Sequence, residues 1–177
     1  KYKITLIINN IKQQFYIFDL IRIINACLSY DYNFFPEPRY IKNPWDNSKM
    51  SVSNIYNIYF FIKNMKNVTV PILFYRFFQS NLDLSHYLNH NQFIIKDYLI
   101  KNYKNFTDDQ NIKYIKKMIN SYNRSKASSN NILIDKLFPD KKLVPIFKPY
   151  LKYYLLSCYS YESDIRIANN ILFKKKL

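Results

Sequence analysis

The two histidines of the chain lie four residues apart, a spacing that could serve metal binding. A helix through His86 and His90 would place both imidazoles on one face, as two ligands of one metal ion require. Asp83 is the nearest third ligand in the sequence, and the segment lacks the glutamate of a metalloprotease helix. We therefore interpret the pair as solvated or hydrogen-bonded histidines and expect no metal and no cofactor.

Catalysis of other kinds finds little support in the residue pattern. Several of the 12 acidic residues stand at predicted helix starts, where capping and dipole compensation explain them: Asp19, Asp83, Asp108, Asp109 and Asp164. No serine or cysteine shows a spacing to histidine that indicates a nucleophilic triad. The chain contains no glycine, which excludes Gly-rich phosphate loops, the dinucleotide fingerprint and the nucleophile elbow. We expect a protein that is not an enzyme.

The excess of basic over acidic residues is the most prominent feature of the composition. The chain has 27 Lys and Arg against 12 Asp and Glu, a formal net charge of +15 at pH 7. One stretch holds the cluster that we predict to bind nucleic acid: Lys101, Lys104, Lys113, Lys116, Lys117, Arg124 and Lys126. A cationic surface attracts phosphates or another acidic polymer. Tyrosines that could stack on unpaired bases lie among these residues: Tyr98, Tyr103, Tyr114 and Tyr122.

The composition also offers a second explanation of this charge. Asn, Ile, Lys and Tyr dominate the sequence, and their codons are A/T-rich, so genome bias accounts for part of the basic and aromatic excess. On this alternative the lysines solvate the surface and the tyrosines fill the core. Arginine reads bases better than lysine but is scarce, and no zinc-finger, helix-turn-helix or RNP pattern is present. Any nucleic-acid binding should therefore lack strong sequence specificity.

Hydrophobic periodicity predicts a mainly α fold, a compact multi-helix single domain over residues 1–177 with a small N-terminal β-hairpin. Hydrophobic residues make up 49% of the chain and aromatic residues 19%, which is ample material for a core. The β-rich runs at residues 2–8 and 13–18 are joined by Asn9-Asn10, and asparagine tolerates the left-handed backbone that tight turns need.

Capping residues predict where the helices begin. The predicted caps are Asp19, Ser51 or Ser53, Thr69 before Pro71, Asp83 or Ser85, Thr107, and Ser163 or Asp164. Pro139, Pro145 and Pro149 predict a connector, followed by a penultimate helix from Tyr150. Residues 124–131 are weakly hydrophobic and predict a flexible loop.

Residues 31–47 predict an irregular aromatic loop that ends in a rigid corner. Pro44 fixes φ there, and Asp46 or Asn47 can bond the backbone two residues on. Trp45 either anchors this corner in the core or stands exposed as a docking aromatic. The candidate docking residues for a protein partner are Phe34, Phe35 and Trp45.

The corner and the helix after it resemble known viral proteins. The residues concerned are Asn43-Pro44-Trp45-Asp46-Asn47, Met50-Ser51 and Ile55-Tyr56-Asn57-Ile58-Tyr59-Phe60. The sequence is similar there to uncharacterised proteins of large nucleocytoplasmic DNA viruses of the mimivirus kind, which share an Asn-Pro-aromatic-x-Asn turn and a Tyr-Asn-Ile-Tyr-Phe helix. Ile55 stands where that group has Leu, and Trp45-Asp46 replaces a Tyr/Phe-Thr pair. The resemblance implies a viral origin but no particular activity.

Two functions follow as hypotheses. The first is a non-enzymatic viral helical domain that binds an anionic partner, nucleic acid in the first place. The alternative is a structural or protein-interaction module of a giant virus, a virion component or assembly adaptor with viral protein partners. The two differ in where the partner sits, on lysine side chains in one case and on aromatic ones in the other.

The expected location is inside the host cell, in the cytoplasm or viral factory, or within the virion. Cys27 and Cys158 lack metal-site spacing and are interpreted as buried free thiols of a reducing compartment. No apolar run approaches the length of a membrane span, and the first residues do not form a signal peptide, so we expect neither membrane insertion nor secretion. The sequence opens on Lys1 rather than Met, as a piece of a longer chain would.

Overall fold

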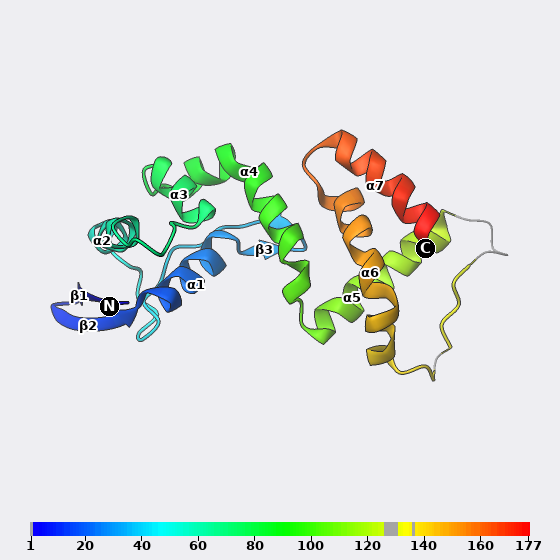
Figure 1. The fold of residues 1–177 in the computed structure, drawn as a ribbon, viewed down its shortest axis with the longest axis horizontal. Coiled ribbons are helices and arrows are strands. Elements are labelled where there is room, and N and C mark those ends of the chain that lie inside the picture. The colour runs from blue at the N-terminus through cyan, green and yellow to red at the C-terminus, as the bar shows by residue number, and fades with distance from the viewer. Residues whose placement is uncertain (1, 126–130, 136) are drawn as a thin grey trace. The chain divides into compact units, whose positions relative to one another are not determined.

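The computed structural model describes residues 2–125, 131–135 and 137–177. Helices dominate it and a small hairpin opens it, which confirms the mainly α prediction (Figure 1). The chain groups into two compact units, Lys1–Ile95 and Lys96–Leu177, here called unit 1 and unit 2. A single domain over residues 1–177 requires that the two units unfold together.

Unit 1 opens with the predicted hairpin of β1 (Lys3–Ile8) and β2 (Ile11–Tyr16), which pair antiparallel. Asn9 and Asn10 connect them with φ of 50° and 62°. Positive φ at both central residues is the type I′ geometry that matches the twist of the strands. Strand β2 begins at Ile11, two residues before the β-rich run that the sequence predicts at 13–18.

The helices of unit 1 are α1 (Ile17–Leu28), α2 (Val52–Lys63), α3 (Ile72–Gln79) and the first part of α4 (Leu84–Lys101). A second hairpin, β3 (Asp31–Tyr32) with β4 (Phe35–Pro36), follows α1. Fully buried side chains from the helices and the first hairpin form the core: Leu6, Ile17, Leu20, Ile24, Leu28, Ile58, Ile62, Leu73 and Phe74.

Two helix starts of unit 1 follow the predicted caps. The hydroxyl of Ser51 accepts a hydrogen bond from the backbone N–H of Asn54 at 3.2 Å, which caps α2. The carboxylate of Asp83 accepts from the backbone N–H of His86 at 2.6 Å at the start of α4. Each bond satisfies a donor of the first turn that has no partner within the helix.

Two other predicted caps are wrong. Helix α1 begins at Ile17, so Asp19 lies within its first turn instead of capping it. Ile17 is fully buried, and starting the helix there brings that side chain into the core. Helix α3 follows the extended Pro71 and has no side-chain cap, so Thr69 does not serve as one.

Asparagine occupies most of the turns for which other proteins use glycine. Left-handed backbone occurs at Asn9, Asn10, Asn33, Phe34, Asn47, Asn81 and Leu82. After α3, the N–H groups of Asn81 and Leu82 donate to the carbonyls of Phe78 and Phe77, both at 3.1 Å. This is a Schellman motif, in which Asn81 holds the position that is usually glycine.

We expect Asn81→Ala to lower the free energy of unfolding by about 1 kcal/mol, because alanine lacks the local polar contacts that let asparagine tolerate positive φ. Asn81→Gly should leave the stability unchanged or raise it, since glycine has no Cβ to clash. Urea denaturation followed by circular dichroism measures both. An alanine variant as stable as the parent would argue against the left-handed turn.

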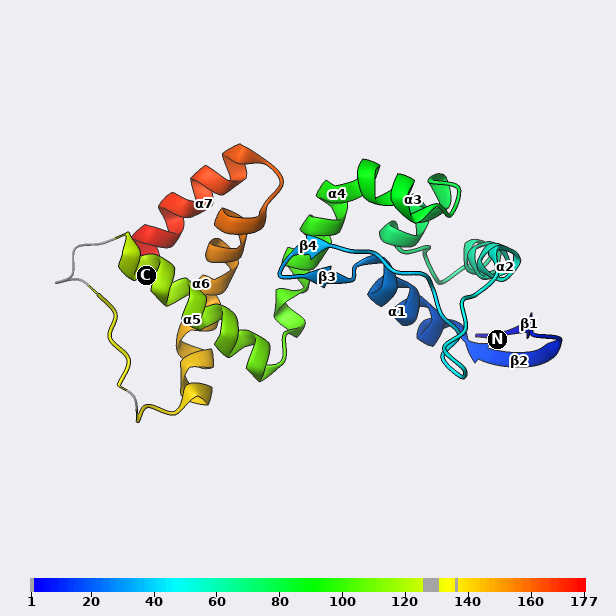
Figure 2. The same ribbon diagram turned by 180° about the vertical axis from the view of Figure 1, so that it is seen from behind.

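Unit 2 contains the end of α4, the 3-10 turn η1 (Asn102–Asn105), α5 (Asp108–Arg124), α6 (Asp140–Tyr159) and α7 (Ser163–Lys176). Helix α6 packs against both α5 and α7 (Figures 1 and 2). Residues 126–130 of the predicted 124–131 loop lie outside the described residues, and Arg124 itself is the last residue of α5.

The predicted cap of α5 is confirmed, whereas the predicted start of the next helix is wrong. Thr107 and Gln110 form a reciprocal capping box, with bonds of 3.3 and 3.0 Å between side chain and backbone. The predicted proline connector is wrong, since Pro145 and Pro149 lie inside α6. Each removes one backbone hydrogen bond, and buried side chains on the same helix, among them Leu143 and Leu151, offset the loss.

Candidate nucleic-acid interface

Helix α5 separates an apolar side from a cationic side. Its buried residues are Asn111, Tyr114, Ile115, Met118, Ile119 and Tyr122. Lys113, Lys117 and Arg124 lie on the opposite side, since the 3.6-residue period places them within about 40° of one another around the axis. The 11 residue steps from Lys113 to Arg124 span about 16 Å at 1.5 Å per step. The structure thus aligns three of the predicted binding residues in one row.

Two of the predicted binding residues are instead held by carboxylates. Lys116 forms an ion pair of 2.6 Å with Asp140 and links α5 to the start of α6. Lys101 forms an ion pair of 2.6 Å with Asp97 one turn earlier in α4. Both pairs are exposed and contribute little to stability. Each carboxylate neutralises part of the positive charge of the predicted basic cluster.

Lys104, another of the predicted residues, does not join the row. Lys104 lies exposed in η1, at the other end of α5 from Arg124. The backbone carbonyl of Lys104 accepts a hydrogen bond from Nζ of Lys148 at 3.3 Å. Lys126 lies outside the described residues. The basic cluster is therefore centred on α5.

Two of the four tyrosines that were predicted to stack on bases are buried in the core. Tyr114 and Tyr122 are 7% and 9% exposed, so the prediction that they stack on bases is wrong for both. The ring of Tyr114 stacks on Phe106 at 5.4 Å. Hydrophobic burial governs these residues, which supports the alternative that tyrosines fill the core.

Buried Tyr114 nevertheless helps to place two of the lysines. Nζ of Lys113 lies 5.5 Å from the centre of the Tyr114 ring, and Nζ of Lys117 lies 5.4 Å from it. Such cation–π contacts are worth about 0.5–1 kcal/mol at an exposed site. They favour side-chain conformations that keep both ammonium groups near the same ring.

A polar pocket of about 340 Å³ adjoins this row, lined by Lys117, Asn120, Ser121, Arg124 and Tyr154. The first four belong to α5 and Tyr154 belongs to α6. Asn120, Ser121 and Tyr154 are not among the binding residues predicted from the sequence. The spacing of 117, 120, 121 and 124 already places these α5 residues on one face, but no local signal shows that α6 supplies the tyrosine.

The tyrosine of this pocket keeps its proton. Burial raises the pKa of Tyr154 well above its ordinary value, and the nearby thiol of Cys158 raises it further. Partial burial of the thiol likewise raises the pKa of Cys158, although the residue is exposed, so the prediction of a buried thiol is wrong for Cys158. The pocket wall therefore adds no negative charge beside Lys117 and Arg124.

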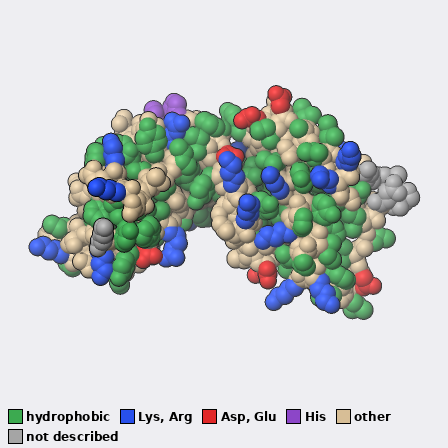
Figure 3. Space-filling model, in the orientation of Figure 1, with side chains coloured by type: hydrophobic (Ala, Val, Ile, Leu, Met, Phe, Trp, Pro, Cys, Tyr) green, Lys and Arg blue, Asp and Glu red, His purple; other side chains and the backbone are tan. Residues whose placement is uncertain are grey.

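Unit 2 carries most of the excess positive charge. By sequence it has 17 Lys and Arg against 7 Asp and Glu, which is +10 of the net +15. Figure 3 shows Lys and Arg side chains scattered over the face of the α5–α7 region that this view presents. Helix α7 ends in Lys174, Lys175 and Lys176, and its C-terminus lies beside the C-terminal end of α5 (Figures 1 and 2).

The proposed docking aromatics divide into one buried and two exposed residues. Phe34 is 3% exposed, so its prediction as a docking residue is wrong. Its backbone N–H donates to the carboxylate of Asp31 at 2.7 Å in the β3–β4 turn, with φ of 66°. Burial of the ring offsets this uncommon backbone conformation. Phe35 is 64% exposed and Trp45 is 73% exposed.

The corner before α2 is anchored by Asn43 and not by Trp45. Asn43 is fully buried. Its amide nitrogen donates to the side-chain oxygen of Gln13 at 3.0 Å, and its amide oxygen accepts from the backbone N–H of Trp45 at 3.2 Å. The predicted Asp46 turn is present, since its carboxylate accepts from the backbone N–H of Ser48 at 2.9 Å. Hydrogen bonds from Ser48 lower the pKa of Asp46.

The histidine pair is engaged with its own helix. The rings of His86 and His90 stack at 4.1 Å, and Nδ1 of His90 lies 2.9 Å from the carbonyl oxygen of His86. In the part of the chain that the structure describes, no three His, Cys, Asp or Glu side chains come together as a metal site.

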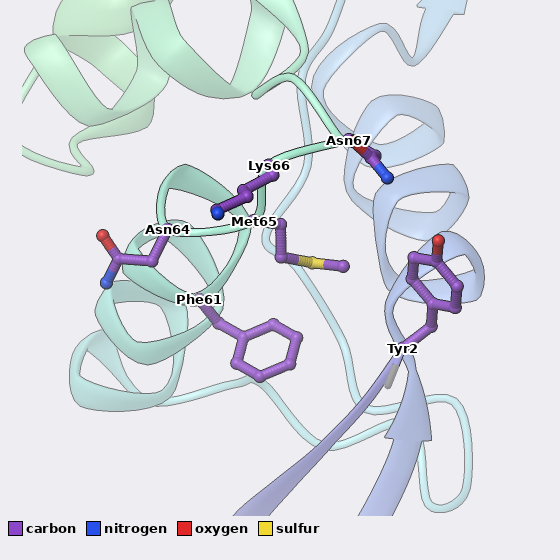
Figure 4. A pocket seen from close by; sticks show the side chains of 6 residues that line it. All are labelled: Tyr2, Phe61, Asn64, Met65, Lys66 and Asn67. Carbon is purple, nitrogen blue, oxygen red and sulfur yellow. The ribbon is translucent and has the colours of Figure 1, made fainter.

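Another pocket, of about 420 Å³, lies in unit 1 between β1 and the end of α2 (Figure 4). Its lining residues are Tyr2, Phe61, Asn64, Met65, Lys66 and Asn67. In Figure 4, Met65 points across the pocket toward Tyr2. The six side chains supply aromatic, thioether, amide and ammonium groups.

Across residues 2–125, 131–135 and 137–177, each helix is too short or too polar to cross a bilayer. Comparison of the chain with protein-family models, curated proteins and solved structures finds no match.

Proposed function

We propose that this chain is a non-enzymatic module that binds nucleic acid through the cationic side of α5, without strong sequence specificity. The observation that carries the proposal is the row of Lys113, Lys117 and Arg124 opposite the buried side of the helix. Cations that neutralise phosphates release condensed counterions, and this supplies most of the affinity of sequence-independent binding. We place this binding in a large DNA virus on the resemblance of residues 43–60 alone.

The burial of Tyr114 and Tyr122 supports contact with the sugar-phosphate backbone rather than with bases. Rings that pack in the core offer no face to a nucleotide. Lysine side chains act as point charges and do not read the bidentate edge pattern of a base pair. Duplex and single strand should therefore bind with affinities that depend on phosphate density more than on sequence.

The test is fluorescence anisotropy with mixed-sequence DNA and RNA oligonucleotides over a range of salt concentrations. We expect the triple variant Lys113→Gln, Lys117→Gln and Arg124→Gln to bind at least tenfold more weakly. On a duplex, the slope of log K against log salt should become shallower by about 0.9 for each phosphate that the variant no longer neutralises.

The matched control removes three charges from unit 1 instead. Lys12, Lys63 and Lys66 are exposed, so Lys12→Gln, Lys63→Gln and Lys66→Gln lower the net charge by the same amount. This control should retain the salt slope of the parent. An equal loss in both variants would show a diffuse charge effect and refute the α5 interface.

Exposed aromatics favour a second function, a protein-interaction module. Phe35 and Trp45 expose more than half of their surfaces in unit 1, and aromatic side chains of this kind anchor protein interfaces. The salt series also separates the two functions. Absence of oligonucleotide binding at the lowest salt would leave the protein-interaction module as the better proposal.

A further inference from the structure

We propose that the pocket between α5 and α6 binds a terminal phosphate group. Where this group belongs to a polynucleotide, the pocket holds one end of the strand. The pocket is lined by Lys117, Asn120, Ser121, Arg124 and Tyr154. The inference rests on the proposed function only for the source of the phosphate, since a free phosphate offers the same chemistry.

The donors of the pocket suit an oxyanion. Lys117, Asn120, Ser121 and Arg124 project from one face of α5 because their spacing is i, i+3, i+4 and i+7. All four carry hydrogen-bond donors, and the guanidinium of Arg124 can engage two oxygens of one phosphate. Tyr154 closes the pocket from α6. None of the five lining side chains is a carboxylate, so the lining itself adds no negative charge beside a bound anion.

The surrounding charge favours the same ligand. The acidic residues of α5, Asp108 and Asp109, stand in its first turn, about 12 Å along the axis from Lys117 at 1.5 Å per residue. Phe173 of α7 packs against Tyr154 with 5.6 Å between ring centres. The run Lys174–Lys176 therefore begins one residue after a side chain that touches the pocket wall. The carbonyls at the end of α5 oppose an anion, and these cations counter them.

A terminal phosphate fits these donors better than an internal one. A phosphate monoester carries a charge of about −1.5 to −2 at neutral pH and three acceptor oxygens. An internal phosphodiester carries a single charge and two unesterified oxygens, and its chain must continue on both sides. A concave site with four donors on one wall therefore favours the end of a strand.

The experiment compares oligonucleotides of one sequence that carry a phosphate at the 5′ end, at the 3′ end or at neither end. We expect the full chain to bind at least one phosphorylated form about fivefold to tenfold more tightly than the unphosphorylated form. The double variant Asn120→Ala and Ser121→Ala should lose this preference, although it changes no charge. Its affinity for the unphosphorylated strand should stay the same.

The matched control is Ser85→Ala with Asn89→Ala, which likewise removes one serine and one asparagine side chain, here from exposed positions on α4. This control should keep the preference for a terminal phosphate. Equal binding of all three oligonucleotides, or a preference that survives loss of Asn120 and Ser121, would overturn the inference and leave the α5 interface standing.

A second arm separates the two proposals. If no oligonucleotide binds at low salt, the proposed function fails and inorganic phosphate alone is titrated into the protein. Shifts in the amide resonances of residues 117–124 that disappear in the Asn120→Ala and Ser121→Ala variant would still support the pocket. Resonances that do not move with phosphate would overturn it.

Discussion

Replacing Phe173 with alanine should loosen the packing of α7 on α5 and α6 and lower the free energy of unfolding of unit 2 by about 3–5 kcal/mol. Phe173 is 2% exposed and is the buried residue of α7. Its ring meets Tyr122 of α5 at 6.1 Å and Tyr154 of α6 at 5.6 Å. Truncation removes the anchor that joins three helices and leaves a cavity between two aromatic rings.

Urea unfolding followed by circular dichroism measures this loss. Ile171→Ala is the matched control, because Ile171 lies on the same helix but is 63% exposed. Surface truncations of this kind change stability by about 0.5 kcal/mol or less. The guanidinium of Arg166 donates to the carbonyls of Ser160 and Tyr161 at 2.8 and 2.9 Å, so the turn before α7 should persist. Equal losses in the two variants would refute the anchoring role of Phe173.

Local sequence signals predicted the helix starts where a single polar side chain decides them. Ser51 and Thr107 cap their helices because an extended hydroxyl residue precedes each apolar run. The signal failed at Asp19 because burial of Ile17 starts α1 earlier. It failed across Pro145 because apolar contacts made by the rest of α6 outweigh the missing backbone bonds.

The candidate interface likewise has features that local sequence signals predict and features that depend on tertiary packing. The row of Lys113, Lys117 and Arg124 follows from the helical period alone. The pairing of Lys116 with Asp140 joins residues 24 positions apart, and no local pattern reveals it. Tyr154 enters the pocket for the same reason, since the packing of α6 on α5 places it there.

The sequence gives the weakest indication of burial for aromatic residues, because one side chain type serves both core and surface. The sequence left the burial of Trp45 open, and the structure exposes it because the polar Asn43 anchors the corner in its place. Tyr114 was expected to be accessible and is buried. Because Tyr and Trp rings are amphipathic, their residue type does not indicate whether other parts of the chain will bury them.

Replacing Phe74 with alanine should lower the free energy of unfolding of unit 1 by about 3–5 kcal/mol. Phe74 is fully buried in α3, and its ring meets that of Tyr59 edge-on at 5.5 Å. Tyr59 in turn stacks on Phe78 at 3.7 Å. The truncation therefore opens a cavity beside an aromatic cluster that joins α2 and α3. Tyr75→Ala on the same helix is the control, since Tyr75 is 40% exposed.

The Phe74 and Phe173 variants together test how the chain unfolds. Each unit contains its own buried residues, so we expect Phe74→Ala to accelerate amide hydrogen exchange in unit 1 and Phe173→Ala to accelerate it in unit 2. Amides whose exchange requires global unfolding report the stability of the unit that holds them. Acceleration of the slowest amides in both units by either variant would instead show a single domain over residues 1–177, because one cooperative transition would then expose both cores.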